Sequence, residues 1–213
     1  MADIWAAVAE LDSDTQAQLV NVLEVRGADA KQQAMRHAFL AAIPFAERAS
    51  VLEVGCGTGV LTRILAGWPG VATVLAVDKA PTMLQMAPEL SGPLPNVQFQ
   101  EADARSLPFE DNSFDAVVFD SSLVHIPEPH HALTEAFRVT APNGYLAVFD
   151  GDYASATVGI GPSDPLQNCV DATVAQVAAD PWIARRLPLL ATTAGFQTDS
   201  FSSFGFLDSS VDG

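Results

Sequence analysis

Hydrophobic positions along this chain alternate between two spacings, and the alternation predicts an α/β fold. Short apolar runs that predict strands lie at 50–54, 72–77, 96–101, 114–119, 144–150 and 197–204. Stretches with apolar residues three or four apart, which predict helices, lie near 59–68, 80–89, 129–140 and 164–194, with a candidate break at Pro181. Strands that alternate with helices are typical of a doubly wound, mostly parallel Rossmann-like sheet with helices on both faces.

The first 48 residues carry three apolar stripes at helical spacing instead. Asp12–Asp14 predicts the capped start of the second helix, because Asp and Ser side chains accept hydrogen bonds from free helix N–H groups. Gly27 is expected to break that helix, and Pro44 to limit the third. We therefore predict an N-terminal helical cap over 1–48 and a core over 49–213. The stripes are Ile4, Val8 and Leu11; Leu19, Val22 and Leu23; and Met35, Phe39 and Ile43.

A glycine-rich turn follows the first core strand directly. Gly55, Gly57 and Gly59 are spaced two apart and lead straight into the next helix. Glycine has no Cβ, so a ligand can approach the backbone of this turn closely. The N-terminus of the following helix adds free N–H groups and a partial positive charge. This strand–turn–helix unit predicts a site for the polar part of a nucleotide-like cofactor.

Polar side chains follow four successive strands at the point where each strand ends. They are Asp78, Asp103, Asp120 with Ser121, and Asp150. The carboxyl ends of parallel strands meet at one edge of a sheet, where the ligand crevice of such folds lies. An acidic residue at the end of the second strand is placed to accept hydrogen bonds from both hydroxyls of a ribose.

Composition narrows the range of partners. The chain has ten Lys and Arg against 26 Asp and Glu, a net charge of −16. Such a surface repels phosphate backbones and anionic membranes, so we expect neither nucleic acid nor a membrane as partner. No apolar run is long enough to cross a bilayer, and the first residues lack the basic region of a signal peptide, so we expect a cytoplasmic protein. Two cysteines are too few for a Cys-rich metal site, and we predict no metal.

In this order, the motifs resemble the class I S-adenosylmethionine (SAM)-dependent methyltransferases, of the small-molecule type similar to ubiquinone and menaquinone methyltransferases. The resemblance covers roughly residues 50–150, and it implies SAM as cofactor, S-adenosylhomocysteine as product and a small-molecule acceptor. The segments that carry it are Val51–Gly59, Asp78, Glu101–Phe109, Phe114–Val118, Leu133–Val139 and Pro142–Leu146.

The resemblance also implies roles for individual residues. The glycine turn would hold the methionine part of SAM, with Glu53 orienting the turn from beneath. Asp78 would bind the ribose hydroxyls, Lys79 and Met83 would flank the adenine, and Asp103 with the Ala104 N–H would bind the adenine edge. Asp120 and Ser121 would lie near the methionine end. The implied cofactor residues are Glu53, Gly55, Cys56, Gly57, Thr58, Gly59, Asp78, Lys79, Met83, Asp103, Ala104, Asp120 and Ser121.

Catalysis requires little from side chains, because the sulfonium of SAM is already activated and positioning supplies much of the rate. His125 is the candidate base, with packing at the strand end as the alternative. Arg26 or Arg36 either meets the carboxylate of the cofactor or lies on a helix surface. Phe39 and Tyr153 are candidates for the acceptor pocket, although most aromatic residues belong to cores.

Two other functions stay open at this stage. A nucleotide-dependent oxidoreductase would carry Gly-x-Gly-x-x-Gly, whereas the third glycine comes one residue early here. The second alternative is a non-catalytic SAM-binding protein or an inactive fragment. It stays open because no strand pattern follows Phe206, whereas the family usually has a final antiparallel strand. The identity of the acceptor, the choice among O-, N- and C-methylation, and the formation of a homo-oligomer are also open.

Overall fold

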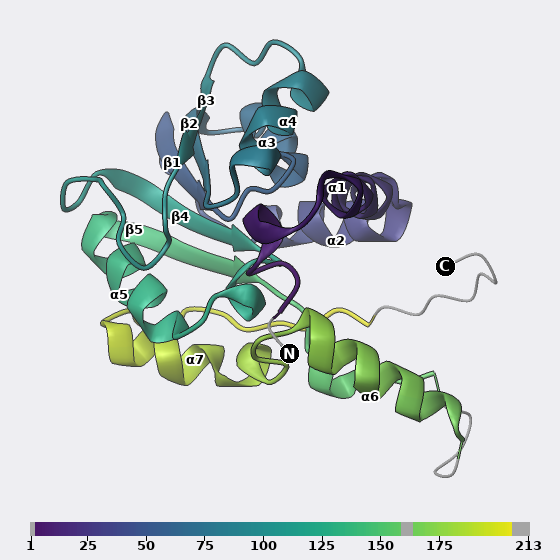
Figure 1. Cartoon of the computed structure of the whole chain (residues 1–213). Helices are drawn as coiled ribbons and strands as arrows, with labels where there is room; N and C mark the ends of the chain where they lie inside the picture. The colour runs from purple at the N-terminus through teal and green to yellow at the C-terminus, as the bar shows by residue number, and fades with distance from the viewer. Residues whose placement is uncertain (1–2, 159–163, 206–213) are drawn as a thin grey trace.

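The computed structural model describes residues 3–158 and 164–205 and shows a parallel sheet covered by helices on both faces (Figure 1). The strands are β1 (Ala49–Val54), β2 (Val71–Asp78), β3 (Val97–Glu101), β4 (Phe114–Asp120) and β5 (Thr140–Phe149). Their order in the sheet is β3-β2-β1-β4-β5, and every neighbouring pair is parallel. The predicted doubly wound α/β fold is confirmed.

A core helix follows each of β1, β2 and β4, whereas β3 leads to β4 without a helix, and two further helices precede β1. The α-helices are α1 (Ser13–Ala28), α2 (Ala30–Ala41), α3 (Val60–Ala66), α4 (Pro81–Ser91), α5 (Pro129–Val139), α6 (Leu166–Val177) and α7 (Ile183–Ala194). Short 3₁₀ helices are η1 (Val8–Glu10), η2 (Leu123–His125) and η3 (Tyr153–Ser155). No helix among residues 3–158 and 164–205 is long and apolar enough to cross a membrane.

Alternate residues of the central strands pack into two hydrophobic clusters, one on each face of the sheet. Leu52 and Val117 belong to the cluster that α5 and α7 cover. Val51 and Val118 belong to the cluster that α2 and α3 cover. Because successive side chains of a strand point to opposite faces, a strand buried on both faces is mainly apolar rather than alternately apolar and polar. This accounts for the continuous apolar runs that predicted β1 and β4.

The sheet has a switch point between β1 and β4. From β1 the chain adds β2 and β3 on one side, and then β4 and β5 on the other. Val54 at the end of β1 therefore lies beside Phe119 near the end of β4. Open α/β sheets bind their ligands outside the carboxyl ends of the strands at such a point. The glycine turn follows the end of β1, and Asp120 is the last residue of β4, so both lie at this switch point.

The N-terminal helices lie at the carboxyl edge of the sheet, next to the glycine turn (Figure 1). Thr58 of the turn donates a hydrogen bond to Glu24 of α1 at 2.6 Å, and Arg63 of α3 donates to the same carboxylate at 2.8 Å. Gly27 of α1 lies so close to α3 that a Cβ there would be 2.8 Å from the methyl groups of Val60. The division into a cap of 1–48 and a core of 49–213 stays a prediction.

Two expectations from the sequence are wrong. Helix α1 does not end at Gly27, since it continues to Ala28, and Asp29 then caps α2. The expected strand at 197–204 is absent from the described residues, where 197–205 are extended without a ladder partner and mostly exposed. Phe204 instead packs on Phe149, with ring centroids 6.1 Å apart. The break expected at Pro181 is confirmed, because α6 and α7 are separate helices.

Glu53 is a carboxyl group inside the sheet, one residue before the end of β1. Only 1% of the residue is exposed, and its Oε2 accepts a hydrogen bond from the Thr62 hydroxyl at 2.6 Å. Burial raises the pKa of Glu53 to about 8, because the charged form would lose its hydration. The negative charge of Asp120 raises the pKa further, whereas the Thr62 hydrogen bond and the positive charge of Arg36 oppose the shift.

The shifted pKa of Glu53 predicts a pH dependence of stability. Between the ordinary pKa of 4.5 and about 8, the folded chain keeps a proton at Glu53 that the unfolded chain releases. The free energy of unfolding of the wild type should therefore fall relative to that of Glu53→Gln as pH rises through this window. The limiting slope is about 1.4 kcal/mol per pH unit. Urea unfolding of both ligand-free proteins at pH 5, 6.5 and 8 measures the difference, and a pH-independent difference would contradict it.

Candidate active site

A cavity of about 260 Å³ lies at the carboxyl ends of β1, β2 and β4, beneath the N-terminal segment. Its walls include all of the cofactor residues expected from the sequence except Gly59. The other wall comes from Trp5–Glu10, together with Arg26, Arg36 and His125. The structure therefore brings the expected residues together around one cavity.

The glycine turn needs glycine for two physical reasons. Gly55, Gly57 and Gly59 have φ values of 76°, 52° and 82°, in the left-handed region that other residues rarely adopt. A Cβ at position 55 would also lie 2.5 Å from the Cβ of Ser122, which follows β4. The hydroxyl of Ser122 in turn donates to the carbonyl of Val54 at 2.9 Å. The turn can thus sit tightly between β1 and β4. The backbone N–H groups of Gly55 and Cys56 donate to the carbonyl of Val77, and that of Gly57 donates to Asp78.

Asp78 and Asp103 both line the cavity, but their carboxylates have different hydrogen-bond partners and opposite pKa shifts. Asp78 accepts hydrogen bonds from the backbone N–H groups of Gly57 and Ala80 at 2.8 and 2.9 Å, and burial raises its pKa. Each of its oxygens keeps a second lone pair for a ligand. Asp103 is clamped by the guanidinium of Arg105 at 2.8 and 3.0 Å, which holds the pKa of that carboxyl well below its usual range.

A buried ion pair crosses the floor of the cavity. The Nε of Arg36, on α2, donates to Oδ2 of Asp120, at the end of β4, at 2.5 Å. The two side chains are 6% and 7% exposed. The Nη1 of Arg36 is buried and has no hydrogen-bond partner among the described residues. A buried, unpaired guanidinium nitrogen is costly, and a carboxylate is the group that satisfies it best.

His125 lies at the end of η2 and lines the cavity beside Trp5. Its ring centroid is 5.9 Å from that of Trp5. Its Nδ1 is 2.9 Å from Oδ2 of Asp3. The carboxylate of Asp3 therefore contacts a ring that is mostly buried, and Asp150 interacts with the same ring electrostatically.

Three of the expected residues do not line this cavity. Gly59 is the last glycine of the turn and the N-cap residue of α3. Phe39 packs on Phe149, with ring centroids 5.5 Å apart, and joins the cluster under α2. Tyr153 borders a second, apolar cavity against α6. The sequence reasoning in turn missed Asp3 and the wall formed by Ala6–Glu10, because neither belongs to a motif, whereas the aromatic ring of Trp5 was already a candidate for lining a pocket.

Comparison with known proteins identifies the domain. The model of a methyltransferase domain family matches residues 52–148. An uncharacterised 37.1 kDa protein in transposon TN4556 of Streptomyces fradiae is 30% identical over 148 residues, 69% of this chain and 43% of that protein. A demethylmenaquinone methyltransferase of Renibacterium salmoninarum is 38% identical over 109 residues, 51% of this chain and 43% of that protein.

A solved structure has the same fold over nearly the whole chain. It belongs to the complex between the Haloferax volcanii Trm112 methyltransferase activator and a putative methyltransferase, with a TM-score of 0.72 and 22% identity. The match covers 93% of this chain and 80% of that chain. By contrast, this chain spans less than half the length of the curated relatives it matches. Taken with the glycine turn and the strand order, the matched region is a class I SAM-dependent methyltransferase domain, distantly related to demethylmenaquinone methyltransferases.

Proposed function

We propose that this chain transfers a methyl group from SAM to a small-molecule acceptor by in-line displacement. The observation that carries the proposal is the buried, unpartnered Nη1 of Arg36 in the wall of the cavity. The methionine part of SAM has a carboxylate that this nitrogen can bind. The neighbouring carboxylates of Asp120 and Glu53 suit the ammonium group of the same zwitterion. The charged groups of the site thus match a zwitterionic amino acid and do not require a ligand with a phosphate group.

The remaining wall suits a nucleoside. Asp78 presents carboxylate oxygens that can accept hydrogen bonds from ribose hydroxyls. Met83, only 3% exposed, and Leu23 provide apolar surface for a purine ring. The backbone N–H of Ala104 and the fixed carboxylate of Asp103 lie where the adenine edge would end. The residues present therefore fit SAM at both of its ends.

SAM, when bound, supplies an activated methyl group and a sulfur atom that takes up the electron pair of the broken S–C bond. The chain contributes position: the glycine turn and Arg36 hold one end, and Asp78 holds the middle. Fixing donor and acceptor in line can provide about 7–11 kcal/mol in the best cases. His125 would accept the proton of the acceptor at Nε2 where the acceptor has one to lose.

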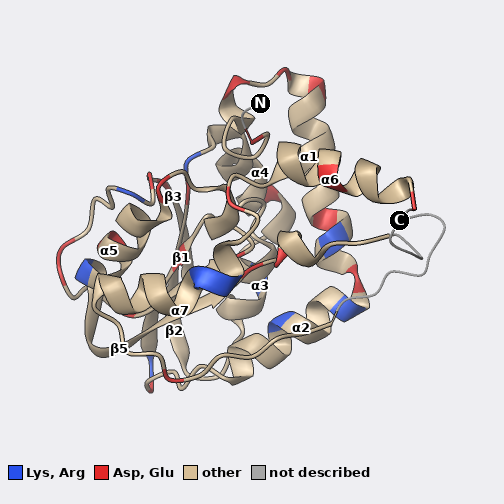
Figure 2. Cartoon of the chain, turned by 90° about the horizontal axis from the view of Figure 1, so that it is seen from below, with Lys and Arg blue, Asp and Glu red and all other residues tan. Residues whose placement is uncertain are grey.

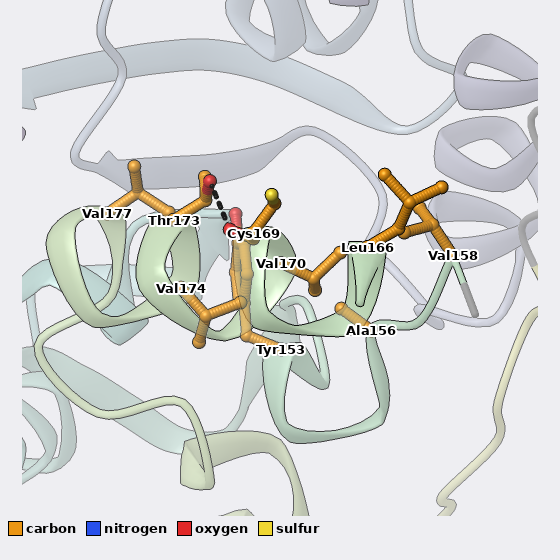
Figure 3. A pocket seen from close by; sticks show the side chains of 9 residues that line it. All are labelled: Tyr153, Ala156, Val158, Leu166, Cys169, Val170, Thr173, Val174 and Val177. Atoms are coloured by element: carbon orange, nitrogen blue, oxygen red, sulfur yellow. Dashed lines mark hydrogen bonds between the residues drawn. The ribbon is translucent and has the colours of Figure 1, made fainter. Parts of the chain in front are cut away.

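The acceptor that fits best is neutral or weakly cationic and partly apolar. Acidic side chains occur around the whole molecule, whereas Lys and Arg mark only a few stretches (Figure 2), so an anionic acceptor would be repelled. Beside the active site, Tyr153 and one side of α6 border a second cavity of about 400 Å³ (Figure 3). Apart from Tyr153, the residue with a hydroxyl group in the lining of this second cavity is Thr173, and that hydroxyl already donates to the Cys169 carbonyl at 2.9 Å. The wall of the second cavity therefore offers mainly apolar contact.

A transfer assay tests the proposed function. The full chain, incubated with methyl-labelled SAM and a panel of neutral and weakly cationic O-, N- and C-acceptors, should transfer label to at least one of them. Equilibrium titration in parallel should show binding of SAM and S-adenosylhomocysteine and much weaker binding of NAD. Binding of SAM without transfer to any acceptor would favour a non-catalytic SAM-binding protein. Preferential binding of NAD would favour the oxidoreductase.

A pair of ligands tests the role of Arg36. Decarboxylated SAM lacks only the carboxylate that we place on the Nη1 of this residue. The wild type should bind SAM at least about tenfold more tightly than decarboxylated SAM, as expected for a charge-assisted hydrogen bond of 1.5–3 kcal/mol. Arg36→Lys keeps the positive charge opposite Asp120 but lacks the second nitrogen that the guanidinium directs at the ligand, so most of this preference should disappear. Isothermal titration of the four combinations gives the coupling. A preference that is unchanged in Arg36→Lys would place the carboxylate elsewhere.

A further inference from the structure

The carboxylate of Asp3 binds the imidazole of His125 from the start of the chain. Oδ2 of Asp3 lies 2.9 Å from Nδ1 of His125 and 2.7 Å from the backbone nitrogen of Ala179. Its Oδ1 accepts a hydrogen bond from the backbone N–H of Trp5 at 2.8 Å. The residue is only 8% exposed. Because both oxygens accept backbone hydrogen bonds, the carboxylate acts as an acceptor, and the proton shared with His125 belongs to Nδ1.

The proton on Nδ1 determines what the other ring nitrogen can do. A neutral imidazole with hydrogen on Nδ1 has a free lone pair on Nε2. Among the described residues, Asp3 provides the one hydrogen bond to the ring of His125, and the ring lines the cofactor cavity. We propose that Asp3 is a positioning residue that holds His125 in the tautomer able to take a proton from the acceptor. This inference rests on the proposed function, in which His125 is the base.

The same segment of chain also covers the cavity. Trp5–Glu10 form part of its wall, and the backbone N–H of Ile4 donates to the carbonyl of Gln176 at the end of α6 at 3.2 Å. The contact between Asp3 and His125 therefore exists when this segment lies over the site. One segment of the chain thus lines the cavity and also carries the carboxylate that binds the ring of His125.

Other ionisable groups face His125 as well, so a pH–rate profile alone cannot identify its tautomer. Asp150 accepts the N–H of Val124 at 3.0 Å, and burial raises the pKa of Asp150 to about 6. Burial also raises the pKa of Tyr153, against the positive charge of Arg26. Asp150 therefore titrates in the range where an imidazole does, whereas Tyr153 titrates well above it. The direct readout is therefore the position of the proton on the ring.

Nitrogen NMR of the imidazole tests the proposal. The full chain carries four histidines, so long-range ¹H–¹⁵N spectra of histidine-labelled protein are assigned by comparison with His125→Gln. The wild type should show hydrogen on Nδ1 of His125. In Asp3→Asn the side-chain amide can donate to Nδ1, so at least half of the population should carry hydrogen on Nε2. Hydrogen on Nε2 in the wild type, or identical spectra in Asp3→Asn, would overturn the proposal.

Gln16→Ala is the matched control. The amide of Gln16 donates to the carbonyls of Val8 and Leu11, both at 3.0 Å, so this variant loosens the same covering segment without touching His125. It should weaken SAM binding but leave the tautomer unchanged. If it shifts the tautomer as much as Asp3→Asn does, packing rather than the carboxylate sets the ring, and the proposal is wrong.

Turnover gives the second readout once an acceptor is known. Asp3→Asn should lower kcat at least about tenfold while the Kd of SAM changes less than about threefold, since a positioned base contributes about 10²–10⁴ in rate. A larger loss in SAM affinity than in kcat would indicate a purely structural role for Asp3 and would contradict the proposal. Absence of any methyl transfer by the wild type would contradict the proposed function instead, and the NMR result would still decide the role of Asp3.

Discussion

The ion pair between Arg36 and Asp120 is the constraint on which the active site depends. It joins α2, which comes before the sheet, to the end of β4 at the switch point, with both side chains almost fully buried. Taking each charge out of water costs several kcal/mol, and a well-packed apolar pair is often equally stable. Stability alone is thus a weak reason for this pair. Ligand binding gives a better reason for the pair. Asp120 holds the guanidinium of Arg36 in a fixed orientation, in which its Nη1 can bind the carboxylate of a ligand.

Glu53 balances the charge beneath this pair. With a pKa of about 8, its carboxyl group is mainly protonated near neutral pH, so the buried region holds one positive and one negative charge rather than an excess of negative charge. A cation bound nearby would favour the ionised form of Glu53 again. The site can therefore adapt its charge to a zwitterionic ligand without moving the backbone. The glycine turn sits directly above, held by Asp78 on one side and Glu24 on the other.

The sequence predicted those parts of the molecule that local chemistry determines. Burial on both faces of β1 and β4 selects apolar residues, which are visible in the sequence as runs. A positive φ and a close contact with Ser122 require glycine at position 55, and the glycine is likewise visible in the sequence. Pairings between distant segments are not visible. Nothing in the neighbourhood of Asp3 indicates that it meets His125, because 122 residues separate them and no motif includes both. The expected strand at 197–204 failed for a related reason: pairing with the outer edge of β5 would join distant segments, and the apolar pattern of 197–204 does not determine such a pairing.

The N-terminal segment and α6 are where this domain differs from a bare SAM-binding sheet. The former lines the cavity at the carboxyl ends of β1, β2 and β4, and the latter provides the apolar wall beside Tyr153. Acceptor recognition would then depend on segments outside the matched region of 52–148, which accounts for the family comparison identifying the domain but not the acceptor.

A crystal structure with S-adenosylhomocysteine is the most direct test of the central claim. The account predicts the ligand in the cavity at the ends of β1, β2 and β4, with its carboxylate on Nη1 of Arg36 and its ribose hydroxyls on Asp78. Its sulfur should face the side of the cavity where His125 lies. A ligand bound elsewhere, or a carboxylate directed to solvent while Nη1 of Arg36 stays unpaired, would contradict the account.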